Sequence, residues 1–287
     1  MTTQQKPDAR SARWIWIGVG LLFVLLTGPI WRWLWGEWMQ NEYYSHGVLV
    51  AGVAGFLAWR RLALRRRAGL PIPQTPDNRG LILLAGGLLA YLWFYQDRAF
   101  FLAAFAMIGV LAGAIWTLGG LGLLRLLVFP VGYLALMVPL PFIERATLPL
   151  ALWTGLCSGT VVQWLGLDVL VNGASVTLPN ADLVVGAQCS GINSLMALTA
   201  LMVLVAYVVQ GPMWGKALLV ALSVPLALLG NILRVANLIV VARFFGVDAA
   251  FTFYHDLSGP LFFGIVLLLL FPLTRAVKCS ELRLDVL

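Results

Sequence analysis

Long apolar runs separated by short polar connectors constrain this chain more than any other feature. There are eight such runs, at roughly 14–35, 46–59, 80–95, 99–118, 121–139, 190–209, 215–241 and 257–274. A helix crosses a bilayer with about 20 apolar residues, or about 17–25 when tilt is allowed. Only 11% of the 287 residues are charged, whereas a soluble domain carries about 25%. The sequence therefore predicts an all-α integral membrane protein with about eight transmembrane helices, in one polytopic domain over residues 1–287.

The net charge of +7 sits mainly in the connectors between the apolar runs. If the N-terminus is cytoplasmic, fourteen of the 19 Lys and Arg residues lie inside, as the positive-inside rule requires. The five on the outer side are Arg32, Arg98, Arg145, Arg234 and Arg243. Both termini are therefore expected in the cytoplasm. Basic residues in short loops are an orientation signal, so we expect membrane lipid, and no nucleic acid, as a partner.

The stretch from about residue 140 to 189 is expected as an insertion on the outer face. Residues 144–165 are amphipathic to apolar and predict an interfacial helix, with a re-entrant segment as the alternative. Residues 168–186 alternate in β-prone runs. Asn172-Gly173 is a strong two-residue hairpin turn, and Pro179-Asn180 supplies a second turn. A small β-hairpin is therefore expected directly before Cys189.

Cys189 stands where the sixth apolar run begins, within GAQCSGINS. The N-terminus of a helix lowers the pKa of a cysteine and offers free amides that can form an oxyanion hole. The position suits a nucleophile, with Ser190 beside it, although a buried structural cysteine is the alternative. Cys157 and Cys279 lie in an apolar run and a basic tail. Three cysteines give no disulfide framework, and no spacing indicates a metal or cofactor.

Three polar residues recur along the seventh run: Asn231, Arg234 and Asn237. The spacing of i, i+3 and i+6 predicts one shared helical face. Arginine near the end of a span is costly unless it faces the bundle or reaches toward the interface. The two asparagines favour an inward-facing polar stripe.

Two histidines, the only ones in the chain, also stand at the predicted outer face. His255, followed by Asp256, precedes the eighth run and can serve as a general base or acid. His46 and Tyr44 open the second run, where they either line a site or anchor the interface. Under the predicted topology Cys189, Arg234, His255 and His46 reach one membrane face, which points to a common site.

Four segments together resemble a known family. GAQCSGINSL, NILRVAN and FYHDLSG, in this order, resemble the three motif blocks of the exosortase/archaeosortase family, and EYYSHGVLV near the start does so too. The resemblance extends over most of the chain, including the eight-span layout and the VNGASVTLPN segment before the cysteine.

The resemblance implies a membrane-embedded cysteine protease or transpeptidase. It places Cys189 on the nucleophile, Arg234 on the essential arginine and His255 on the third position, where archaeal relatives carry arginine. The other candidates for orienting or substrate-binding roles are Asn231, Asn237, Asp256, Ser190, His46 and Tyr44.

The same resemblance also implies substrates and a location. The expected substrates are exported proteins with a C-terminal tail made of a Pro-Glu-Pro motif, one transmembrane helix and a basic cluster. Exopolysaccharide machinery is a further candidate partner. The expected location is the bacterial cytoplasmic (inner) membrane, with the active site on the periplasmic side.

Three other functions stay open from the residues alone. A transporter is expected to carry charged or broken helices near mid-membrane, often in inverted repeats, and no repeat is evident here. A polysaccharide-assembly or lipid-linked glycan enzyme would rely on carboxylates and arginines without a cysteine at a helix cap. A non-catalytic assembly factor would be insensitive to changes at Cys189.

Overall fold

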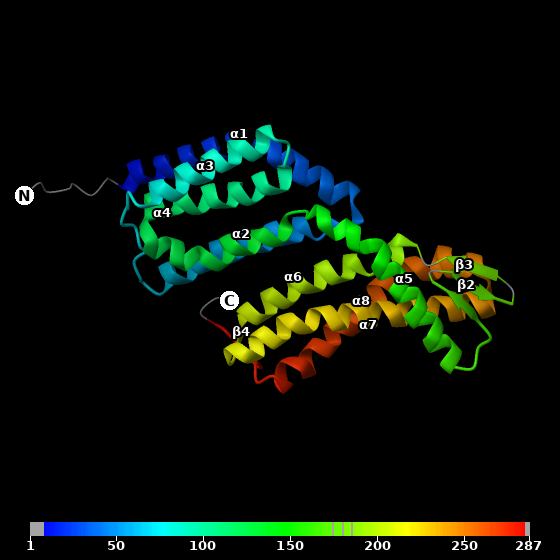
Figure 1. The fold of residues 1–287 in the computed structure, drawn as a ribbon. Helices are drawn as coiled ribbons and strands as arrows, with labels where there is room; N and C mark the ends of the chain where they lie inside the picture. The colour runs from blue at the N-terminus through cyan, green and yellow to red at the C-terminus, as the bar shows by residue number, and fades with distance from the viewer. Residues whose placement is uncertain (1–8, 174, 180, 185, 285–287) are drawn as a thin grey trace, which may run out of the picture. The chain divides into compact units, whose positions relative to one another are not determined.

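The computed structural model describes residues 9–173, 175–179, 181–184 and 186–284 (Figure 1). It divides into two compact units, Met1–Pro139 and Leu140–Leu287. The boundary falls where the predicted outer-face insertion begins. That the whole chain forms one membrane domain stays a prediction, and each unit is described here by itself.

The first unit is entirely helical among its described residues. Its elements are α1 (Ala9–Gln40), η1 (Glu42–Tyr44), α2 (Gly47–Arg67), α3 (Gly80–Gln96), α4 (Phe100–Tyr133) and η2 (Leu134–Met137). α1, α2 and α3 each correspond to one predicted apolar run, and α4 together with η2 corresponds to two. Helices form here because apolar runs in lipid must satisfy their backbone groups internally.

α4 is interrupted at Gly120, which has φ 79° and ψ 171°. A straight helix of 34 residues would be about 50 Å long. However, Phe100 at its start stacks near Trp33 with ring centroids 5.8 Å apart. Beyond its end, the carbonyl of Met137 accepts the indole N–H of Trp38 at 3.0 Å. Both ends of α4 therefore meet the same end of α1, and the chain turns back at Gly120 (Figure 1). The two arms correspond to two consecutive predicted runs.

The connector between α2 and α3 packs against this interruption. Thr75 and Asp77 donate their backbone N–H groups to carbonyls of α4 at 3.3 and 3.1 Å. The Asp77 carboxylate accepts the backbone N–H of Arg79 at 3.0 Å and the indole N–H of Trp116 at 2.9 Å. These two donors lower the pKa of Asp77, the first more than the second. A side chain at Gly120 would collide with the carbonyl of Thr75, which explains why glycine stands at the turn.

Among the residues that the structure describes, five helical stretches are long and apolar enough to cross a membrane. They are Trp14–Gln40, Glu42–Arg67, Phe100–Met137, Met213–Phe245 and Leu257–Ala276. Two apolar helices are shorter, namely Gly80–Gln96 and Ile192–Val208. The chain is thus a multi-pass, mostly helical membrane protein with a small β-sheet, as predicted in outline. The count of eight spans is not confirmed.

Among its described residues, the second unit contains four long helices, a three-stranded sheet and a two-stranded sheet. Its helices are α5 (Pro141–Trp164), α6 (Ile192–Val208), α7 (Met213–Phe245) and α8 (His255–Ala276). The short elements are β1 (Leu170–Asn172), β2 (Ser175–Leu178), β3 (Ala181–Val184), η3 (Ala187–Cys189), β4 (Val209–Gln210), the π-helix η4 (Ala249–Tyr254) and β5 (Glu281–Leu282). A helix over 144–165 was expected and is present as α5. Its interfacial or re-entrant placement stays a prediction.

The predicted hairpin is a three-stranded antiparallel sheet in the order β1-β2-β3. Asn172 pairs with Ser175, so the first turn lies one residue later than Asn172-Gly173. Gly173 occupies it with φ 61°. Leu178 pairs with Ala181, which brackets the second predicted turn; its residue 180 lies outside the described residues.

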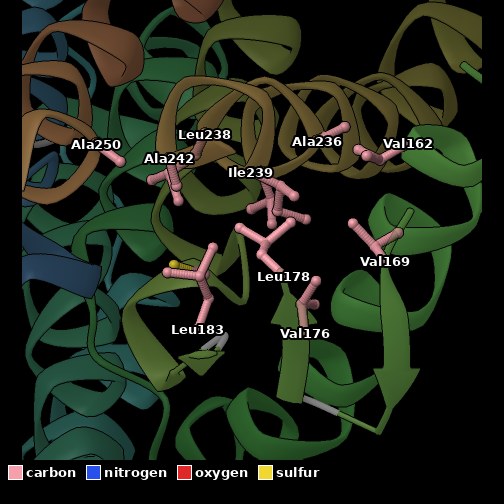
Figure 2. Close-up of a cluster of buried hydrophobic side chains, with 12 residues drawn as sticks. Val162, Val169, Val176, Leu178, Leu183, Ala236, Leu238, Ile239, Ala242 and Ala250 are labelled. Carbon is pink, nitrogen blue, oxygen red and sulfur yellow. The ribbon is translucent and has the colours of Figure 1, made fainter. Parts of the chain in front are cut away.

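One face of this sheet packs on α7. Val176, Leu178 and Leu183 are buried and point toward Ile239 and Ala242 of α7 (Figure 2). The alternation of buried and exposed residues along β2 follows from the two-residue period of a strand. The sheet therefore covers the C-terminal half of α7, just before the chain enters η3.

The C-terminal segment is also fixed by packing. β5 pairs with β4, and Cys279 is fully buried beside Gly211 and Gly215. Cys279 lies in the basic segment after α8, and its thiol fills the space that these two glycines leave.

Candidate functional site

Cys189 ends the short 3-10 turn η3, three residues before α6 begins at Ile192. Gly191 precedes α6 in the left-handed conformation, with φ 78°. Ser190 is fully buried, and its hydroxyl accepts the N–H of Ile192 at 3.5 Å. The predicted position of Cys189 at the start of this helix is confirmed, and Ser190 stabilises the local turn.

Asn231 of α7 connects the Cys189 segment with α5 and with Arg234 of α7. Its amide Nδ2 donates to the carbonyl of Cys189 at 2.7 Å and to the hydroxyl of Thr154 at 3.2 Å. Its Oδ1 accepts a guanidinium N–H of Arg234 at 3.2 Å. Asn231 is 4% exposed, so these bonds form where water cannot replace them. The predicted orienting role of Asn231 thus has a defined geometry.

Gly191 allows this close approach. A Cβ at Gly191 would lie 2.7–2.8 Å from side-chain atoms of Asn231. Its φ also lies in the region that other residues rarely adopt. Both the backbone conformation and the space therefore require glycine at this position.

The thiol of Cys189 is buried, with 5% of the residue exposed. It belongs to the apolar cluster under the sheet, together with Leu178 and Leu183. Burial raises the pKa of Cys189, while the charge of Arg234 and a backbone hydrogen bond from Gly186 act in the opposite direction. The expectation that the helix N-terminus would give a low thiol pKa is wrong for this state, because desolvation outweighs those contributions.

Arg234 is half-buried and lies between α7 and α8. A Cβ at Gly259 of α8 would come within 3.9 Å of its Nη1. A small pocket opens beside it, lined by Ser194, Leu198, Leu226, Ala227, Gly230, Asn231, Arg234, Gly259, Phe262, Phe263 and Val266. Its walls on α6, α7 and α8 are mostly apolar, and Arg234 is the cationic side chain among the residues that line it. The guanidinium is therefore bound to Asn231 on one side and borders open space on the other.

His255 is the first residue of α8, and Asp256 follows it. Their side chains lie outside the described residues. Gly259, four residues further along α8, approaches Arg234 of α7. A role of His255 at the site stays a prediction.

Asn237 does not join the hydrogen-bond network in which Asn231 contacts Cys189, Thr154 and Arg234. Its side chain is exposed, whereas Asn231 is buried and Arg234 is half-buried. The expected polar stripe therefore turns away from the interior, because each step of three residues rotates the side chain by about 60° around the helix.

His46 and Tyr44 belong to the first unit, where both are buried. The Nε2 atom of His46 lies 3.2 Å from the carbonyl of Leu136 and donates to it. This bond ties the start of α2 to η2, which is a structural role. A substrate-lining role for these two residues stays a prediction.

Two α5 residues near the site were missed from the sequence. Thr154 and Ser158 are fully buried, and the Ser158 hydroxyl donates to the carbonyl of Ile232 at 2.9 Å. With Gly155 and Gly159 they form a small-residue stripe, which lets helices approach closely in membranes. That spacing was the available signal, and it was hidden in a segment interpreted as interfacial.

Comparisons with known proteins give one match, to a family model. A sequence model described as transmembrane exosortase matches residues 38–272, which include all the residues of the network. No curated protein and no solved structure matches the chain. The match spans well over half of the 287 residues, and the chain therefore belongs to the transmembrane exosortase family.

Proposed function

We propose that this protein is a cysteine protease/transpeptidase of the bacterial inner membrane. It cleaves the Pro-Glu-Pro sorting tail of exported proteins on the periplasmic side. Both termini are cytoplasmic in this proposal. The observation that carries it is the Asn231 network, which couples the backbone of a cysteine at a helix start to a half-buried arginine.

Arg234 is the group best suited to stabilise negative charge in this site. The backbone N–H groups of Cys189 and Ser190 already donate to carbonyls within η3, at 2.9 and 3.1 Å. They are therefore not free to form an oxyanion hole in this state. The guanidinium keeps several donors beyond its bond to Asn231, in a planar fork suited to an oxyanion or a thiolate.

The reaction begins when the Cys189 thiol gives its proton to a base, for which His255 is the candidate. The sulfur then attacks the scissile carbonyl, and the resulting oxyanion faces Arg234. The C–N bond breaks, the leaving amine takes the proton from the protonated base, and a thioester remains on Cys189. Water, an amine or a hydroxyl then attacks the thioester, which releases the product and restores the thiol.

Processing of a reporter tests this proposal. The reporter is an exported protein that carries a Pro-Glu-Pro motif, one transmembrane helix and a basic cluster, taken from the genome that encodes this chain. The reporter is expected to be shortened by wild type and by Cys157→Ala, because Cys157 lies on α5 outside the network. Cys189→Ala is expected to leave it full-length. A reporter that is shortened in the Cys189→Ala strain would sink the mechanism.

A further inference from the structure

β3 is an edge strand of the small sheet. The strand order β1-β2-β3 leaves one side of β3 without a neighbouring strand among the described residues. Such an edge presents backbone donors and acceptors in a row, ready to pair with another extended chain.

The register identifies the residues whose backbone groups point outward. Leu178 and Ala181 close a two-residue turn, so their pair exchanges hydrogen bonds. Hydrogen-bonded and non-bonded pairs then alternate along the ladder. Consequently Asp182 and Val184 direct their N–H and C=O groups away from β2. No bond to these groups is present in the described part of the chain.

The same strand is adjacent to the nucleophile. Val184 is 66% exposed, whereas its neighbour Leu183 is 3% exposed and shares an apolar cluster with Cys189. Val184 precedes Cys189 by five positions along the chain. A peptide paired with β3 would therefore lie next to the strand whose Leu183 packs in the same apolar cluster as the Cys189 thiol.

We propose that β3 binds the substrate as an added strand. The occupant is the extended segment of the exported protein next to its Pro-Glu-Pro motif, held by the four outward backbone groups of Asp182 and Val184. Such pairing depends on backbone groups, so it does not require one particular side-chain sequence in the bound segment. The inference rests on the proposed function and adds how the scissile segment is held.

Disulfide cross-linking tests the pairing directly. The chain carries Val184→Cys together with Cys189→Ala, which keeps the reporter uncleaved, and with alanine at Cys157 and Cys279. Single cysteines are placed at successive reporter positions next to the motif, and the pairs are oxidised in membranes. Because strand side chains alternate between two faces, we expect strong cross-links at every second reporter position.

The outcomes separate this inference from the proposed function. Cross-links of equal strength at consecutive positions, or none, would overturn binding at β3 if wild type still shortens the reporter. Cross-links mainly between two copies of Val184→Cys would assign the edge to self-association and would also overturn it. If wild type does not shorten the reporter, the proposed function fails, and the docking inference fails with it.

A backbone change gives an independent measurement. Asp182→Pro removes one outward N–H, and proline is tolerated on the free side of an edge strand. Asp182→Ala is the matched control, since it removes the same carboxylate but keeps the N–H. Loss of one hydrogen bond corresponds to roughly a tenfold effect, so reporter processing by Asp182→Pro should be about tenfold slower than by Asp182→Ala. Equal rates in the two variants would contradict the pairing.

Discussion

Asn231→Asp is the substitution that separates charge from shape at the site. Aspartate has nearly the same shape as asparagine, and it can still accept the Arg234 bond seen at 3.2 Å. It has no N–H to donate to the carbonyl of Cys189, which Asn231 meets at 2.7 Å. The variant therefore keeps one contact of the network and loses another.

The size of the effect follows from these contacts. A hydrogen bond contributes about 0.5–1.5 kcal/mol, and a buried carbonyl left without a donor costs about 1–3 kcal/mol. The interactions that hold the Cys189 segment in place should thus weaken by about 3 kcal/mol. If the whole loss appears in the activation free energy, reporter processing becomes roughly a hundredfold slower. The new carboxylate also neutralises Arg234, one of the groups that lower the pKa of Cys189. That pKa should therefore rise further.

The assay follows alkylation of Cys189 in the purified protein as a function of pH, with Cys157 and Cys279 replaced by alanine. Since burial raises the thiol pKa, wild type should react slowly at neutral pH and faster as the pH rises. In Asn231→Asp the whole curve should move to higher pH, because less thiolate is present at each pH. Wild-type alkylation and wild-type processing in this variant would refute the role given to Asn231.

Three further predictions concern single contacts. Gly191→Ala should slow reporter processing at least tenfold, because the left-handed backbone costs about 1–2 kcal/mol and the added methyl group would displace Asn231. Arg234→Lys should fold but process the reporter at least tenfold more slowly, since a point charge cannot replace the planar fork; a near wild-type rate would reduce Arg234 to an orientation signal. Asp77 has a lowered pKa, so the stability it contributes is present above about pH 4 and is lost as the pH falls through the lowered value. Thermal unfolding in detergent should show this loss, and Trp116→Phe should weaken it.

The orientation of the chain needs a reporter other than Cys279. Its thiol is fully buried, so its failure to react with an impermeant maleimide would say nothing about the side of the membrane. Ser280→Cys is exposed next to it and supplies a matched probe. Labelling of Ser280→Cys from outside intact cells would contradict the predicted cytoplasmic C-terminus.

The sequence by itself determined the class of the protein and the position of its cysteine. Long apolar runs in a chain this poor in charge favour membrane helices, because a helix satisfies its own backbone groups in lipid. The break at Gly120, the turns of the sheet and the start of α6 shortly after Cys189 depend on local residue preferences, which the sequence records directly. The motif segments around Cys189, Arg234 and His255 are likewise short stretches that can be identified in the sequence alone.

Tertiary structure decided the chemical state and the connections of the site. Whether Cys189 has a high or low pKa depends on how much of the sheet covers it, since desolvation competes with the charge of Arg234. Thr154 entered the network only because α5 packs on α7, and Asn237 left it because the helix turns the side chain outward. Burial and contacts between distant segments arise from packing, and no local pattern along the chain specifies them.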